Sequence, residues 1–134
     1  MALKRSVIEG NILYTEVTGV FSSDDAIEAL NALPEYFSEG EIYEVLFIAN
    51  GTRGAFNSHE EHVQVVIVQS MVLAKAKGGA IALVSEEDLF FGLFRSAETQ
   101  LENESINAEI KSFRSLDVAI NWIKETRDKS KKRI

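Results

Sequence analysis

The sequence predicts a single α/β domain: a mostly parallel sheet of about five strands, covered by helices and edged by an antiparallel hairpin. Two continuous apolar runs, at residues 45–49 and 80–84, have the composition of strands that are buried on both faces of a sheet. A segment with helical spacing follows each run, and this alternation implies crossover connections between parallel strands. The expected order is β-β-α-β-α-β-α-β-α, with one domain at 1–126 and a basic flexible tail at 127–134.

The chain begins with a pattern typical of a β-hairpin. Strands are predicted at residues 5–9 and 11–18, and the second has the two-residue alternation of a pleated strand. Between them, Gly10 and Asn11 tolerate the positive φ of a tight turn. A first helix is expected after Ser22, whose hydroxyl can cap it, and Pro34 is expected to end or interrupt that helix.

A second helix is predicted after the apolar run at 45–49 and a glycine-bearing loop. Ser58 and Glu61 match a capping box, so the helix is expected from His59 to about residue 77, with Gly78 and Gly79 as its C-cap. Its β-branched residues would also suit a strand, but the cap, the length and the terminal glycines favour a helix.

This second helix is apolar almost all round. One stripe can face the sheet, whereas a second stripe, formed by Val65, Val68 and Val72, needs a neighbouring helix or a second subunit. We therefore expect a homodimer that uses these three valines.

The C-terminal half repeats the alternation. After the strand at 80–84, Ser85 is expected to begin a helix that runs to about Leu101. Residues 106–113 alternate as an edge strand does, and the last helix starts near Ser115.

The charge distribution argues against nucleic-acid binding. The net charge is −7. The last eight positions hold five basic residues and only one acidic residue, so the rest of the chain has 9 basic and 20 acidic residues. Such an acidic body repels a phosphate backbone. No apolar run approaches the about 20 residues of a membrane span, and no cysteine is present. These features fit a cytoplasmic protein.

Two segments suggest a family. The turn at residues 19–22 leads into a helix, and the closing segment 113–123 places Phe113, Ser115, Ala119, Trp122 and Ile123 in a characteristic spacing. Together with the element order, they resemble the SpoIIAA-like proteins, which are small STAS-like bacterial domains with a fold related to lipid-binding CRAL-TRIO modules. The stretch 88–95 resembles the helix before the last strand in short members.

The resemblance implies a non-enzymatic binding or regulatory module that acts through protein–protein contacts. Anti-sigma-factor antagonists of the family carry Asp-Ser-[Ser/Thr]-Gly after the third strand, and a serine there is phosphorylated. Residues 50–58 lack this motif, so a phosphorylation switch does not carry over, and Thr52 and Ser58 are candidates by position alone.

The loop before the second helix is a candidate anion site. Free N–H groups at a helix N-terminus favour an anion, and Arg53 could add a forked contact to phosphate or carboxylate. The candidate residues are Asn50, Thr52, Arg53, Ser58, His59 and His62. Neither a P-loop nor a zincin motif is present, so no metal and no cofactor is expected. Capping by Ser58 and solvation of the histidines explain the same residues.

Phe90, Phe91 and Phe94 form an aromatic cluster on the third predicted helix. Core packing is the simpler explanation, but the cluster could also line a pocket for a small apolar or amphipathic ligand. Three hypotheses therefore stand in order: a binding module, a ligand carrier, and an enzyme that acts on an anionic substrate at residues 50–62. No catalytic constellation supports the third.

Overall fold

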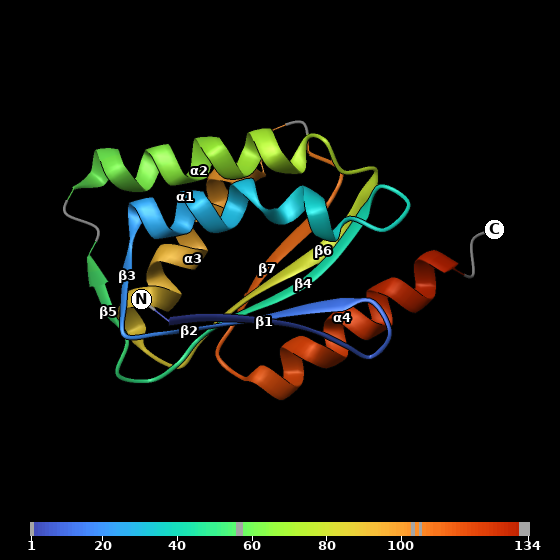
Figure 1. The fold of residues 1–134 in the computed structure, drawn as a ribbon, viewed down its shortest axis with the longest axis horizontal. Helices are drawn as coiled ribbons and strands as arrows, with labels where there is room; N and C mark the ends of the chain where they lie inside the picture. The colour runs from blue at the N-terminus through green and yellow to red at the C-terminus, as the bar shows by residue number, and fades with distance from the viewer. Residues whose placement is uncertain (1, 56–57, 103, 105, 132–134) are drawn as a thin grey trace.

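A five-stranded sheet forms the centre of the computed structural model, with three helices on one face and one on the other (Figure 1). The structure describes residues 2–55, 58–102, 104 and 106–131. The strands are β1 (Ala2–Ile8), β2 (Ile12–Thr18), β4 (Glu41–Ile48), β6 (Gly78–Ser85) and β7 (Glu109–Phe113). They lie in the order β1-β2-β4-β6-β7, and only β1 is antiparallel to its neighbour. The predicted fold class is confirmed.

The helices are α1 (Ser23–Asn31), α2 (His59–Leu73), α3 (Asp88–Leu101) and α4 (Leu116–Lys131), with a 3₁₀ turn η1 at Leu33–Tyr36. Successive side chains of the central strands point to opposite faces of the sheet, so they belong to two separate cores. In β6, Ile81 and Leu83 pack toward α1, α2 and α3, while Ala82 and Val84 pack toward α4. A strand buried on both faces therefore explains the continuous apolar run.

Helix α1 begins after Ser22, as the sequence predicts, and ends at Asn31, three residues before Pro34. Ser22 Oγ accepts a hydrogen bond from Asp25 N, and Asp25 Oδ2 accepts one from Ser22 N, both at 3.2 Å. This reciprocal capping box satisfies backbone donors that have no partner inside the helix. Pro34 lies in η1, after the last residue of α1.

The hairpin turn differs in detail from the prediction. Positive φ falls on Glu9 (49°) and Gly10 (91°) rather than on Gly10 and Asn11. Asn11 instead uses its side-chain oxygen to accept a hydrogen bond from Arg127 Nη1 at 2.8 Å.

The predicted C-terminus of α2 is wrong. The helix ends at Leu73, and Gly78 and Gly79 belong to β6 instead of capping α2. Gly79 has φ of +127°, and a Cβ at this position would lie 1.8 Å from the carbonyl oxygen of Ile42 on β4. The glycine is therefore required by close approach of two strands.

Two short strands in the loops were not predicted. β3 (Val20–Ser22) and β5 (Arg53–Ala55) pair in parallel as a separate two-stranded sheet, and Arg53 N donates to Gly19 O at 2.7 Å. Three residues are too few for a periodic signal. The helix α3 also differs at its start: its N-cap is Glu87, and Ser85 Oγ accepts from Glu87 N at 3.1 Å.

The expected boundary at residue 127 falls inside α4, which continues to Lys131. The side chain of Arg127 is 11% exposed and donates a hydrogen bond to the carbonyl of Glu9 at 2.6 Å. This contact links α4 to the hairpin turn. Residues 132–134 of the predicted tail lie outside the described residues. Within the described part of the chain, no helix has the length and apolar character needed to cross a membrane.

Candidate functional site

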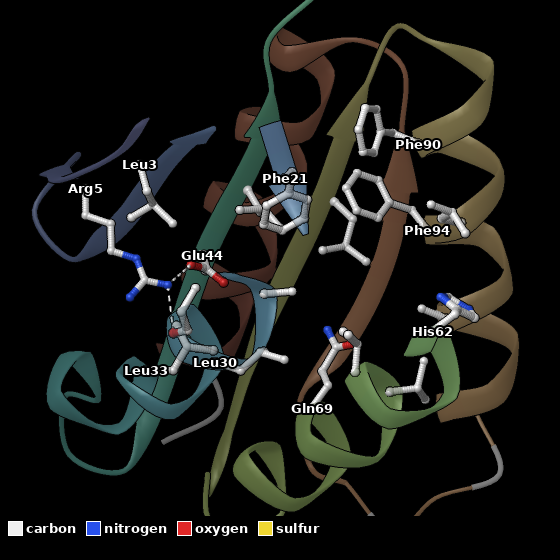
Figure 2. A pocket seen from close by; sticks show the side chains of 18 residues that line it. Leu3, Arg5, Phe21, Leu30, Leu33, Glu44, His62, Gln69, Phe90 and Phe94 are labelled. Atoms are coloured by element: carbon white, nitrogen blue, oxygen red, sulfur yellow. Dashed lines mark hydrogen bonds and ion pairs between the residues drawn. The ribbon is translucent and has the colours of Figure 1, made fainter. Parts of the chain in front are cut away.

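A cavity of about 70 Å³ lies between the sheet and helices α1, α2 and α3 (Figure 2). Most of its walls are apolar side chains, chiefly Phe21, Leu30, Val66, Phe90, Leu93 and Phe94. Four polar side chains interrupt these walls: Arg5, Glu44, His62 and Gln69. A concave apolar site with a few convergent polar groups is the usual form of a small-molecule site.

The way the helices pack explains the space. Val72 and Leu73, near the end of α2, are buried in the same core cluster as Ile42 and Ile81 of the sheet. The first half of α2 lines the cavity instead, through His62, Val65, Val66 and Gln69. The facing positions of α1 and α3 include Ala26, Ala29 and Ala97, whose small side chains leave the space unfilled.

One end of the cavity holds a buried polar network. Arg5 Nη2 lies 3.6 Å from Glu44 Oε2, with the two side chains only 10% and 5% exposed. Thr15 lies between them, donating to Glu44 Oε2 at 2.9 Å and accepting from Arg5 Nε at 3.1 Å. Burial raises the pKa of Glu44, an effect that Arg5 and the Thr15 hydroxyl partly oppose.

A second polar position comes from α2. His62 is 8% exposed, and its Nε2 is buried with no hydrogen-bond partner among the described residues. Burial lowers the pKa of His62, and nearby His59 lowers it further, so the imidazole is neutral at pH 7. Gln69 lies two turns further along the same face, and Figure 2 shows both side chains on the cavity side of α2.

The predicted aromatic cluster divides between two environments. Phe90, which is 1% exposed, and Phe94 line the cavity, and the Phe90 ring lies 6.5 Å from that of Phe21 between centroids. Phe91 points elsewhere: the Arg114 guanidinium lies 4.2 Å from its ring centroid. Two of the three phenylalanines therefore belong to the candidate site.

The structure gives the first half of the predicted anion loop other partners. Asn50 Nδ2 donates to Glu86 Oε2 at 2.7 Å, and Gly51 N donates to Glu87 Oε1 at 2.6 Å. Thr52 is buried and its hydroxyl donates to the carbonyl of Val17 at 3.2 Å. Two carboxylates thus occupy the donors that an anionic substrate would need.

The rest of the loop does not converge on one point. Arg53 is exposed on β5, and Ser58 Oγ accepts from Glu61 N at 3.2 Å as the N-cap of α2. His59 is exposed, with its ring centroid 6.5 Å from that of His62. No cluster of three or more metal-ligating side chains occurs in the described residues, and positions 56 and 57 lie outside them. Of the six candidates, His62 alone lines the cavity.

The valines expected at a dimer interface face inward. Val72 is 4% exposed, and Val65 and Val68 pack against the core beneath α2. The outer surface of the helix carries Ile67 and Met71 instead, 44% and 63% exposed. Because α2 lies between α1 and α3, its inward face is wider than one stripe and includes these three valines.

Sequence reasoning missed Arg5, Thr15, Glu44 and Gln69. The signal was present for Glu44: alternation across residues 41–48 places it on the same sheet face as Ile42 and Leu46. Because the strand was predicted to start at residue 45, this charged residue was left outside it. The partners of Glu44 come from two other strands, which no local pattern could join.

No protein-family model matches the chain, and no curated protein or solved structure is significantly similar to it. The STAS-like resemblance stays a prediction.

Proposed function

We propose that this protein binds a small, largely apolar molecule in the cavity between the sheet and helices α1, α2 and α3, and acts as a carrier or sensor of it in the cytoplasm. The observation that carries the proposal is the combination of an apolar cavity with His62 Nε2 at its wall, a buried atom that has no hydrogen-bond partner within the described part of the chain. A buried polar atom without a partner costs about 1–3 kcal/mol, which a ligand that hydrogen-bonds to it would recover.

The walls define how such a ligand would lie. Its apolar part would contact Phe21, Phe90 and Phe94, and its polar end would reach His62 and Gln69. The volume of about 70 Å³ is roughly half that of an engineered cavity of about 150 Å³ that binds benzene. The cavity therefore suits a compact molecule, or one end of a longer one.

The test combines native mass spectrometry of freshly purified protein with binding of small apolar probes. Cyclopentane and cyclopentanol would be titrated by ligand-observed NMR, with the shift in melting temperature as a second readout, since a ligand that binds only the folded state raises it. Binding of either probe is expected, and a retained molecule in the native spectrum would identify the natural ligand.

A matched pair of variants locates the site. Ala29→Leu adds volume at a position that lines the cavity, whereas Glu28→Leu places the same side chain at a neighbouring exposed position of α1. Probe affinity should fall at least tenfold in Ala29→Leu and remain unchanged in Glu28→Leu. Equal affinity in both folded variants, or no binding by the wild-type protein, would overturn the proposal.

A second candidate function is assembly through the outer face of α2. Ile67 and Met71 are four residues apart, lie on one face of the helix, and are both exposed. In this second proposal, the pair would form the apolar centre of a protein–protein contact, either a homodimer or a complex of a STAS-like module with a protein partner. Light scattering after size exclusion should give a dimer mass that Ile67→Glu with Met71→Glu reduces to a monomer mass. A monomer in the wild-type protein would exclude the homodimer.

An enzymatic role at residues 50–62 is not part of the proposal. The donors of Asn50 and Gly51 are already bound to carboxylates, and Arg53 is exposed on β5. Substituting Arg53→Ala should accordingly leave probe binding unchanged.

A further inference from the structure

The polar side chains that line the cavity indicate which kind of polar group its ligand carries. We infer that it selects an uncharged molecule with a single hydroxyl group, such as a small alcohol, and discriminates against carboxylates and amines of similar size. This inference rests on the proposed ligand binding and adds a selectivity that the proposal alone does not require.

The two charged side chains at the cavity, Arg5 and Glu44, already pair with each other. Among the described residues that line it, Arg5 is the only cation; its Nε contacts Thr15 Oγ1 at 3.1 Å, and its Nη2 contacts Ala29 O at 3.0 Å and Glu44 Oε2 at 3.6 Å. A ligand carboxylate would find this cation already paired with Glu44 and would be repelled by the Glu44 carboxylate. A ligand ammonium would meet Arg5. Because each charged ligand would lose its hydration without a free counter-charge, both should bind weakly.

The two uncharged polar side chains at the cavity, His62 and Gln69, can both bind a hydroxyl group. His62 Nε2 is buried without a hydrogen-bond partner among the described residues, and the buried side chain of Gln69 lines the same cavity. A neutral imidazole nitrogen is a donor in one tautomer and an acceptor in the other, and an amide offers both. A hydroxyl group can donate and accept, so it satisfies either tautomer of His62. The low pKa of His62 agrees with this, because it keeps the ring uncharged at neutral pH.

The experiment compares four probes of similar size: cyclopentane, cyclopentanol, cyclobutanecarboxylate and cyclopentylamine. Dissociation constants would be measured at pH 7.5 by ligand-observed NMR. Cyclopentanol should bind about tenfold more tightly than cyclopentane, since one net hydrogen bond is worth about a factor of ten. It should also bind at least tenfold more tightly than the carboxylate and the amine, which lose their hydration without a free counter-charge. A carboxylate or an amine that binds as tightly as the alcohol would overturn the inference.

Variants of α2 test the hydrogen-bonding residues. His62→Leu should weaken cyclopentanol binding about tenfold while leaving cyclopentane binding within twofold, and Gln69→Leu provides the second variant if the first does not fold. If cyclopentanol binds as tightly to both folded variants as to the wild-type protein, the hydroxyl is not recognised by these residues and the inference fails. If no probe binds, cyclopentane included, the proposed function itself fails. Binding of cyclopentane with no preference for the alcohol overturns the selectivity alone.

Discussion

Arg5 and Glu44 form an ion pair across the sheet, although strand β2 separates their strands. Arg5 Nη2 lies 3.6 Å from Glu44 Oε2, and Thr15 of β2 makes a hydrogen bond to each partner. Arg5 Nη2 also donates to Ala29 O of α1 at 3.0 Å. The network therefore joins three strands to the helix that covers the cavity. Buried pairs of this kind depend on both partners, because removal of one leaves an uncompensated charge.

We expect Glu44→Gln to destabilise the protein by about 3 kcal/mol, since it leaves the Arg5 guanidinium buried without a counter-charge. Urea denaturation followed by circular dichroism would measure the change in the free energy of unfolding. The double variant Arg5→Met with Glu44→Leu is the control, and its stability should lie within about 2 kcal/mol of wild type. A double variant that is less stable than Glu44→Gln would show that an uncompensated charge is not the cause of the loss.

The stability of the protein should fall as the pH drops below 6.5, in part because of His62. Burial lowers the pKa of this side chain in the folded state, so between its folded and unfolded pKa values the unfolded chain binds more protons. His62→Leu removes this contribution, and the stability difference between variant and wild type should grow as the pH falls from 7.5 to 5.0. Glu44 titrates in both proteins and cancels from the difference, although its raised pKa acts in the opposite direction.

His59→Gln substitutes the exposed histidine one turn earlier, and it should keep most of the wild-type pH dependence, because burial, the larger cause of the lowered His62 pKa, remains. Denaturation of the three proteins at pH 5.0, 6.5 and 7.5 would give the comparison. If His62→Leu showed the same pH dependence as wild type, the burial of the imidazole would be in doubt.

Gly79→Ala should destabilise the protein by more than about 3 kcal/mol, because the added Cβ would lie 1.8 Å from Ile42 O in addition to the cost of φ +127°. Gly10→Ala provides the comparison: its φ is +91°, but nothing lies within 4 Å of an added Cβ. The free energy of unfolding of this second variant should fall by about 1 kcal/mol, which is the cost of placing alanine at positive φ. Similar losses in the two melting curves would argue against the close pairing of β4 and β6 at this point.

Phe90→Ala should cost about 3–5 kcal/mol and enlarge the cavity, because the ring is 1% exposed and packs near Phe21. Phe91→Ala removes an adjacent ring that contacts Arg114 on the surface, so the free energy of unfolding should fall by only about 1 kcal/mol. Thermal unfolding measures both. The Phe90→Ala variant should also accept larger probes such as toluene, and an unchanged size limit would place the binding site elsewhere.

Local signals predicted the fold because they are periodic and repeated. The runs at 45–49 and 80–84 indicated strands covered on both faces, and the Ser22 and Ser58 caps marked the starts of two helices. The small β3–β5 sheet escaped prediction because three-residue strands carry no period. The end of α2 was misplaced because Gly79 is required by a contact with Ile42, which is distant in sequence.

The candidate site was less accessible to sequence reasoning, as the two histidines show. His59 and His62 are three residues apart in the same first turns of α2 and look equivalent in the sequence. In the structure, His59 is exposed and His62 is buried at the cavity. The direction in which α2 faces decides between them, and that direction follows from its packing against α1 and α3.

By itself, the sequence determined the five strands of the main sheet, their alternation with four helices and the burial of two strands on both faces, since the alternation of side chains along a strand and the spacing along a helix are local properties. Only the tertiary structure decided that Arg5, Thr15 and Glu44 meet across three strands, and that His62 and Gln69 face Phe90 and Phe94 over unfilled space. The physical reason is that a cavity is a mismatch of volumes between elements, here left by alanines on α1 and α3, and no single segment encodes it.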